Sequence, residues 1–432
     1  METKNQILTD RSRSIEFQRC PRARFLGYHW GGHGLALAGL SVPLTTGTYV
    51  HVGVGAVLAG KSVEEGVERA VAAYDAEVGR RGFADPHTDA AETVAEQRAL
   101  TEALVRVFAV RRWPELTREF EVLETEREDE FELTRLQPRY ISIQTPTGGG
   151  PNQSAEYECV DGEPVVWMSR ADALLRQRET DDLYVYSLKT ASQWSQTRDE
   201  EARHDMQGLS EIAGIEERLT REDRPAQLMG VQMDYLVKGD RNARSGWRQD
   251  SPLVRPWRKV SQFGPAEWVW TTKVPCVEPQ TCKYHRSRPS ANPYHNLGDE
   301  WERVNVWEHT SVREWVEMLA SGAVQPEAGD PLAHAVITPV PYFRQRDEME
   351  AWRRQMAGQE GRVARLLTED ADQVREPTLP WLDEFWPQHR RSCDWPSKCV
   401  FQRICFEGAL DDPLGNGYVW RVPHHAPELV QK

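Results

Sequence analysis

The first third of the chain has the polar and apolar spacing of helices. A short helix is predicted over 14–28. Ser62 and Glu65 form a capping-box pair, which predicts the start of a longer helix. A further long helix is predicted over about 88–112, and Pro114 is expected to stop it.

The middle of the chain changes to the alternation of strands. Its order of two helices, several strands, a helix and a strand predicts an α/β or α+β core, a mixed central sheet flanked by helices. The predicted strands cover 120–133, 139–145, 165–177, 183–191 and 227–239, with an amphipathic helix over 199–219.

Three parts follow from these changes of pattern. Residues 1–239 hold the predicted core and its N-terminal helices. Residues 240–330 are rich in tryptophan and proline, which indicates an insertion of irregular and β structure. Residues 331–432 predict a strand over 334–343, a helix over 346–367 and a cysteine-rich segment that returns to the N-terminus.

The composition indicates a soluble globular protein, with 39% hydrophobic and 28% charged residues. No apolar run reaches the roughly 18 residues of a membrane span, and the N-terminus is polar, so we expect a cytoplasmic protein. In a reducing compartment, the seven cysteines are expected to be metal ligands or buried thiols and not disulfides.

The net charge of the whole chain, −14, does not favour nucleic-acid binding, because the affinity of proteins for nucleic acids comes largely from neutralising the phosphates with basic side chains. Two segments, 11–24 and 238–259, are nevertheless locally basic. They are interpreted either as the lining of a basic channel that meets a DNA backbone or as ordinary solvated surface.

An aspartate and a lysine follow each other on neighbouring predicted strands. Asp172 lies on the 165–177 segment and Lys189 near the end of 183–191. Together they could hold a divalent metal beside a phosphate and orient an attacking water. A structural salt bridge is the simpler interpretation of the same pair.

Several short motifs in a fixed order extend this pair. In that order the chain resembles the RecB and CRISPR-associated RecB-like nucleases of the PD-(D/E)XK superfamily. The resemblance covers roughly 14–220 and resumes at 393–405. The motifs are Cys20-Pro21, Gly47-Thr48-Tyr49-Val50-His51, Glu126, Ser169-Arg170-Ala171-Asp172, Ser187-Leu188-Lys189-Thr190 and Gln207-Gly208-Leu209-Ser210-Glu211.

The resemblance implies a restriction-endonuclease-like core that cleaves DNA, as single strands or at ends, in settings such as repair or phage recombination. It implies that His51, Asp172 and Glu126 bind Mg²⁺ or Mn²⁺, that Lys189 assists the water, and that Gln207 positions metal, water or DNA. Two neighbours share the strand parity of Glu126 and are alternatives to it, namely Glu124 and Glu128.

Two positions depart from the family pattern. Ser187 stands where an acid is expected, and a serine cannot replace a charged carboxylate ligand. Glu211 stands where a tyrosine is expected, four residues after Gln207 on one helix face. Three interpretations follow. In the first, Glu211 supplies the missing acid. In the second, another nearby acid or a water does so. In the third, the fold is inactive and binds nucleic acid or a partner protein.

The C-terminal cysteines form a C-x5-C-x5-C pattern of Cys393, Cys399 and Cys405. With the remote Cys20, they are the set that the resemblance implies for a [4Fe-4S] cluster joining the chain ends. A zinc ion on four thiolates, or no metal at all, are the alternatives.

A second cysteine set lies in the insertion. Cys276, Cys282, His285 and His295 have a spacing that allows a structural zinc site. Unliganded loop residues are the alternative interpretation.

Overall fold

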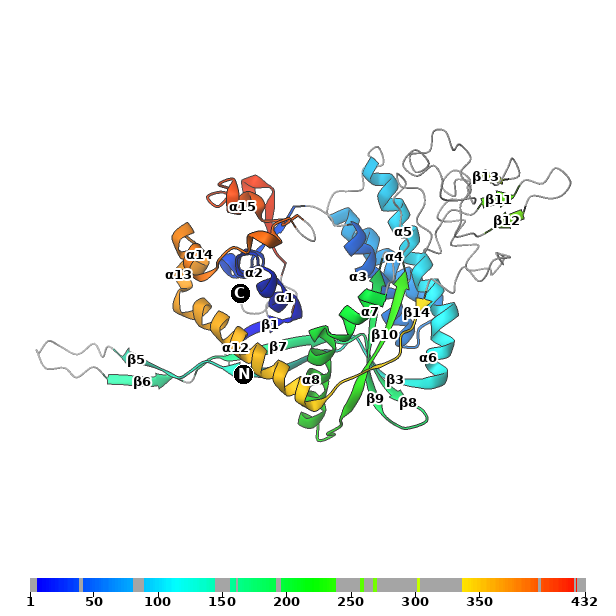
Figure 1. Ribbon diagram of the computed structural model, residues 1–432, viewed down its shortest axis with the longest axis horizontal. Helices are drawn as coiled ribbons and strands as arrows, with labels where there is room; N and C mark the ends of the chain where they lie inside the picture. Colours follow the sequence, from blue (N-terminus) through cyan, green and yellow to red (C-terminus); the bar gives the residue numbers. More distant parts are fainter. Residues whose placement is uncertain are drawn as a thin grey trace, which may run out of the picture.

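The computed structural model is a mixed α/β structure in which helices cover sheets of parallel and antiparallel strands (Figure 1). The coarse fold class expected from the sequence is therefore confirmed. The structure describes residues 6–38, 42–80, 89–143, 156–160, 162–191, 196–237, 257–259, 267–269, 301–303, 336–394, 398–422 and 425.

The largest sheet has the order β14-β10-β9-β8-β3, and β15 also pairs with β10. β9 is parallel to β10 and antiparallel to β8. β9 and β10 are mostly buried, which explains their nearly continuous apolar sequences. The strand predicted over 183–191 is confirmed, whereas the one predicted over 334–343 is two short strands. The members are β3 (Phe120–Thr125), β8 (Ala173–Gln177), β9 (Leu183–Ala191), β10 (Leu228–Val237), β14 (Val336–Ile337) and β15 (Tyr342–Phe343).

Two other predicted strands are each broken in two. The segment 120–133 is interrupted at Glu126, whose φ of 51° is left-handed backbone that no strand continues through. The segment 165–177 is interrupted at Ala171 and Asp172. Both segments thus pass side by side from the large sheet into a second sheet, which has the strand order β1-β7-β4. The second sheet holds β1 (Ile7–Asp10), β4 (Glu128–Arg135) and β7 (Pro164–Arg170).

Three helices, α3 (Val42–Leu58), α4 (Val63–Arg80) and α5 (Asp89–Val107), pack against the large sheet around one apolar cluster. The capping box that opens α4 is confirmed: Glu65 N donates to Ser62 Oγ over 3.2 Å, and Ser62 N donates to Glu65 Oε2 over 3.0 Å.

Pro114 does not end the helical run, contrary to the prediction. After α5 the chain passes through a π-helical turn, Phe108–Arg112, into α6 (Trp113–Glu119). Pro114 lies in the first turn of α6, where its missing N–H costs little.

A second helical layer consists of α8 (Met206–Arg221) and α12 (Arg346–Glu369), which share an apolar cluster with the strands. The helix predicted over 199–219 is in fact two, since α7 (Gln196–Arg203) ends before Asp205. Asp205 is the N-cap of α8, and its carboxylate accepts a hydrogen bond from Gln207 N.

The two ends of the chain lie together. Figure 1 shows the N-terminal helices, in blue, among the orange and red C-terminal ones. β16 pairs antiparallel with β2, and Arg421 Nη1 donates to Gly27 O over 2.9 Å. We call this part the terminal module. Its elements are α1 (Arg11–Arg19), α2 (Pro21–Tyr28), β2 (Leu35–Leu37), α13 (Ala371–Arg375), α14 (Leu379–Phe385), α15 (Gln402–Phe406), β16 (Tyr418–Trp420) and the 3₁₀ turns Trp30–Gly32, Arg390–Ser392 and Leu414–Asn416.

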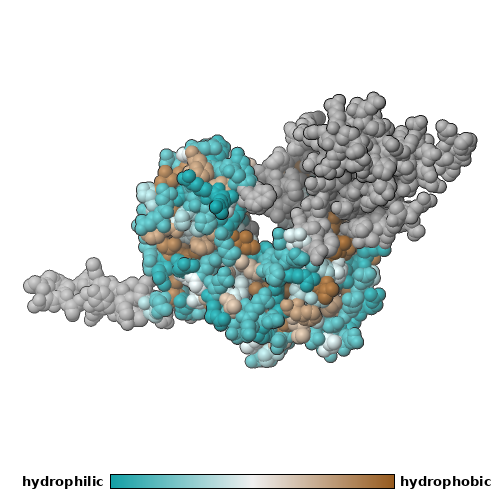
Figure 2. Space-filling model, viewed as in Figure 1, coloured by the Kyte–Doolittle hydropathy of each residue, from teal (hydrophilic) through white to brown (hydrophobic). Residues whose placement is uncertain are grey.

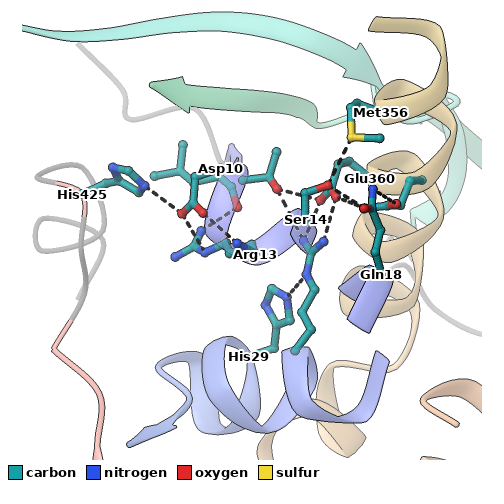
Figure 3. Close-up of polar contacts among 12 residues, drawn as sticks. Asp10, Arg13, Ser14, Gln18, His29, Met356, Glu360 and His425 are labelled. Atoms are coloured by element: carbon teal, nitrogen blue, oxygen red, sulfur yellow. Dashed lines mark hydrogen bonds and ion pairs between the residues drawn. The ribbon is translucent and has the colours of Figure 1, made fainter. Parts of the chain in front are cut away.

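A buried polar network fixes α1 and α2 to α12 (Figure 3). Glu360, 1% exposed, accepts two hydrogen bonds from the Arg24 guanidinium, at 2.6 and 2.7 Å, and one from Thr9 Oγ1 at 2.7 Å. Ser14 Oγ donates to Met356 Sδ and accepts from Gln359 Nε2. These contacts hold the three helices together.

Three of the five arginines of 11–24 do not contribute to the basic surface that we considered from the sequence. Arg13, Arg22 and Arg24 are buried. Arg22 is paired inside the terminal module, Arg13 is paired with Leu8 and Asp10 of β1, and Arg24 is paired with Glu360 of α12. Their charges are neutralised by Asp10, Asp383 and Glu360. They stabilise helix packing and are not available to a DNA backbone. The basic segment 238–259 lies almost wholly outside the described residues.

The remaining strands are short. β5 (Arg139–Ile143) and β6 (Glu156–Val160) form a hairpin, and β11 (Trp257–Lys259) pairs with β12 (Glu267–Val269) and β13 (Trp301–Arg303). Among the described helices, none combines the length and the apolar character that crossing a bilayer requires. The coloured surface in Figure 2 is mostly hydrophilic, with scattered apolar patches.

Candidate metal and catalytic site

Three of the predicted ligands come together at the bend between the two sheets. His51 on α3, Glu126 after β3 and Asp172 before β8 each offer a ligand atom, and these atoms lie within 4.8 Å of one another. His51 Nδ1 and Asp172 Oδ1 are 2.8 Å apart. Among the described residues, this is the one cluster of three or more His, Cys, Asp or Glu side chains with such spacing.

The bend itself places the two carboxylates. Glu126 N donates to Asp172 O over 3.1 Å, so a backbone hydrogen bond joins the two points where the strands are interrupted. The alternative Glu124 is instead paired with Arg218, and Glu128 with His425. Glu126 is therefore the glutamate that the fold directs to this cluster.

Two glycines let α3 approach closely. A Cβ on Gly55 would lie 3.1 Å from Glu126 Cγ, and a Cβ on Gly47 would lie 2.7 Å from Thr190 Oγ1. Gly47 begins the motif that carries His51. Its lack of a side chain thus has a packing reason: the helix can approach β9 at the motif's threonine.

The two carboxylates differ in their electrostatics. Burial alone would raise the pKa of Asp172, but His51, the Leu188 N–H at 2.6 Å and Lys189 hold it below its usual value. Burial and the charge of Asp172 raise the pKa of Glu126. Two neighbouring carboxylates that repel each other, with an imidazole beside them, are a donor set that fits a hard divalent cation.

A second group of predicted residues lies beside this cluster. Lys189 Nζ on β9 donates to Gln207 Oε1 on α8. Gln207 Nε2 donates to Ser187 Oγ over 3.2 Å and to Glu211 Oε1 over 2.6 Å. One amide side chain therefore joins the lysine, the serine at the unusual position and the glutamate one helical turn later.

Glu211 is a buried acid with an unused oxygen. It is 2% exposed, and its Oε2 has no hydrogen-bond partner. Burial raises the pKa of Glu211 to about 8, against the opposing effects of Lys189 and Gln207. It lies outside the three-residue cluster, although the charge of Asp172 acts on it. An orphaned buried carboxylate oxygen is costly unless a cation or donor meets it.

The four cysteines of the expected cluster lie in the terminal module. Cys20 joins α1 to α2, and His389 N donates to its Sγ over 3.5 Å. Cys399 N donates to Cys393 O over 2.7 Å. All four are free thiols, and Cys20 shares an apolar cluster with Cys399 and Cys405.

Electrostatics also link these thiols. Burial and the charges of Cys399, Cys20 and Cys393 together raise the pKa of Cys405 to about 12, against the opposing effect of Arg22. Four thiolates could be held together there only by a strongly positive partner. The possible zinc ligands Cys276, Cys282, His285 and His295 lie outside the described residues.

Sequence reasoning missed two residues. Arg11 forms a two-point ion pair with Asp205, the cap residue directly before the helix that carries Gln207 and Glu211. The signal for Asp205 was present, because an aspartate before an amphipathic helix is a typical N-cap. The signal for Arg11 was not, since its partner is 194 residues away.

Comparison with known proteins adds no assignment. No protein-family model matches the chain. No curated protein matches it either.

Proposed function

We propose that the chain is a metal-dependent DNA nuclease with a RecB-like PD-(D/E)XK core. The observation that carries the proposal is the cluster of His51, Glu126 and Asp172 at the sheet bend, with Asp172 hydrogen-bonded to the strand that presents Lys189. A metal-ligand set beside a strand that presents a lysine supplies the groups that metal-dependent phosphodiester hydrolysis uses. The substrate is single-stranded DNA or DNA ends, as the motif resemblance implies.

His51, Glu126 and Asp172 would hold Mg²⁺ or Mn²⁺. When bound, such an ion supplies positive charge that stabilises the pentavalent phosphate and eases ionisation of the attacking water. The carboxylate of Asp172 is kept ionised for this role by His51 and the Leu188 N–H. Lys189, oriented by Gln207, contributes a directed ammonium group that stabilises developing negative charge.

Glu211 is the proposed substitute for the missing motif acid. Glu211 accepts a hydrogen bond from the Gln207 side-chain amide, which also donates to Ser187. The Gln207 amide therefore bridges the Glu211 carboxyl and the serine that stands at the acid position of the motif. Because the pKa of Glu211 is raised to about 8, this role requires that the carboxyl loses its proton, which a cation bound nearby would favour. The unpartnered Oε2 would then accept a hydrogen bond from the attacking water. The acid has, on this proposal, moved from the strand to the helix.

Cleavage assays test both statements. With Mn²⁺ and end-labelled single-stranded and duplex DNA, the wild-type chain should cleave, and Glu211→Ala should lower the rate by about 10²–10³-fold. Glu217→Ala, on the same helix but half exposed, is the matched control and should cleave normally.

The two ideas fail in different ways. If the wild type cleaves nothing with any divalent ion, the nuclease proposal is wrong, and DNA binding at low salt would then favour an inactive fold with Ser187 as the reason. If Glu211→Ala keeps its activity, only the substitution is wrong.

We further propose that Cys20, Cys393, Cys399 and Cys405 hold a [4Fe-4S] cluster. Their placement in one module supports a shared group. A zinc ion on the same four thiolates is the alternative.

Anaerobic purification is expected to give a brown protein with broad visible absorbance and bound iron. Cys20→Ser should lose both the visible absorbance and the bound iron, because the Cys20 thiol would be one of the four ligands. Cys159→Ser, which changes a cysteine outside the set, should keep them. A colourless wild type with stoichiometric zinc would contradict the iron-sulfur assignment.

A further inference from the structure

We infer that Arg11 is a positioning residue, through which the terminal module holds the first turn of α8 and thereby Gln207 and Lys189. The inference rests on the proposed function for its catalytic meaning, although the contact can be tested without it. Arg11 is the first residue of α1, and Cys20 ends the same helix.

The contact is a two-point ion pair. Arg11 Nε donates to Asp205 Oδ1 over 2.8 Å, and its Nη2 donates to Oδ2. Asp205 Oδ1 also accepts from Gln207 N over 2.9 Å, which caps α8. One carboxylate is thus shared between an arginine of the terminal module and the start of the helix that carries the proposed acid. Planar pairing of this kind fixes orientation as well as distance.

The cap controls where Gln207 points. Its backbone N–H is held by Asp205, and its side-chain amide contacts Lys189, Ser187 and Glu211. If the first turn of α8 frays, the partner that orients Lys189 moves with it. Helix ends that lose their cap fray first, since their N–H groups lack partners.

The other end of the connection is rigid. α1 spans nine residues, which is about 13 Å of helix. Ser14 attaches it to α12 and Arg13 attaches it to Leu8 O at 2.7 Å (Figure 3). At the far end Arg19 donates to Ser392 O and Cys20 accepts from His389 N. Because α1 contacts the cysteine segment at one end and Asp205 at the other, we expect a displacement of that segment to reach Arg11 through this one helix.

Arg11 is less suited to a direct phosphate contact. Its side chain is 34% exposed, but two of its donor nitrogens are committed to Asp205. A phosphate would have to displace Asp205 or accept from the remaining edge alone. The geometry therefore favours positioning over DNA contact.

Hydrogen exchange provides a test that needs no activity. In Arg11→Ala, the backbone amides of 206–209 are expected to exchange at least about tenfold faster than in the wild type, because the cap loses its partner. Arg98→Ala, which breaks an exposed ion pair with Asp75, is the control and should leave these amides unchanged. Unchanged exchange in Arg11→Ala would overturn the inference, whether or not the chain is a nuclease.

Kinetics then test the positioning role. Arg11→Ala should lower the single-turnover cleavage rate by about 10–100-fold, with DNA affinity, Mn²⁺ affinity and melting temperature close to wild type. Arg11→Lys should recover part of the rate. Asp205→Asn should resemble Arg11→Ala, and the double variant should be no slower than either single one. Multiplicative losses, or a parallel loss of DNA affinity, would contradict positioning.

The link to the terminal module has its own readout. Cys20→Ser should accelerate exchange at 206–209, and combining it with Arg11→Ala should add nothing further. Should Cys20→Ser fail to fold, Ser14→Ala loosens α1 from α12 without touching a cysteine and should accelerate the same amides. Normal exchange at 206–209 in a folded Cys20→Ser or in Ser14→Ala would show that α1 does not transmit the displacement.

Discussion

The Asp172→Asn variant is expected to lose about 10³-fold or more of the proposed DNA cleavage, the largest effect on activity of any single change. Asp172 meets His51 at 2.8 Å and the Leu188 N–H at 2.6 Å. Asparagine keeps the shape and one acceptor oxygen but removes the charge. The variant should fold and fail to hold the ion. Single-turnover cleavage with Mn²⁺ measures the rate, and calorimetric titration with Mn²⁺ measures the affinity.

The matched control is Asp75→Asn, because Asp75 is an exposed aspartate in an ordinary ion pair on α4. It should cleave and bind Mn²⁺ as the wild type does. Near-normal cleavage by Asp172→Asn would remove Asp172 from the site and, with it, the main support for the nuclease proposal.

The Glu360→Gln variant is expected to lower the free energy of unfolding by about 3–5 kcal/mol, the largest effect on stability. Glu360 and Arg24 are each 1% exposed, and their ion pair is extended by Thr9 and Gln359. A neutral glutamine leaves the Arg24 charge buried without a counter-ion. Urea unfolding should show the loss, whereas Asp75→Asn should cost less than about 1 kcal/mol.

The difference in the free energy of unfolding between the wild type and Glu360→Gln should decrease as pH falls. Burial would raise the pKa of Glu360, but Arg24, Thr9 and Gln359 bring it below its ordinary value of 4.5. The unfolded chain therefore binds the proton first as pH falls. The contribution of the ionised group is complete above about pH 4.5 and is lost as pH falls through the folded pKa. A difference between wild type and Glu360→Gln that grows on acidification would contradict the ion-pair explanation.

The sequence predicted the cluster residues through their order along the chain. Asp172 directly precedes β8, Lys189 lies on β9, which pairs with β8, and His51 precedes both on a helix. The i, i+4 spacing of Gln207 and Glu211 was enough to place both on one helix face, and the hydrogen bond between them is present. Local periodicity accounts for this helix-face relation, whereas His51, Glu126 and the metal-binding role of Asp172 were expected from the resemblance to the RecB-like motifs.

The breaks in the strands were not predictable in this way. The alternation of 120–133 continues through Glu126 although the backbone turns there. The bend exists because two hairpin strands leave one sheet and enter another together, and that depends on which strands pair. The same reason explains the arginines of 11–24, whose spacing looked like a basic surface. Arg22 and Arg24 are buried against Asp383 and Glu360, partners that are more than 300 residues away.

The sequence by itself determined the mixed α/β class, the strand over 183–191 and the approximate place of the other segments, and it singled out His51, Asp172 and Lys189 as candidate site residues. The tertiary structure alone decided that Glu126, and neither neighbouring glutamate, meets Asp172. It also decided that Arg11 caps the helix of Glu211 through Asp205. The physical reason is that periodicity reports which face of an element is buried. Contacts between remote charged groups depend on how elements pack, and no local pattern encodes them.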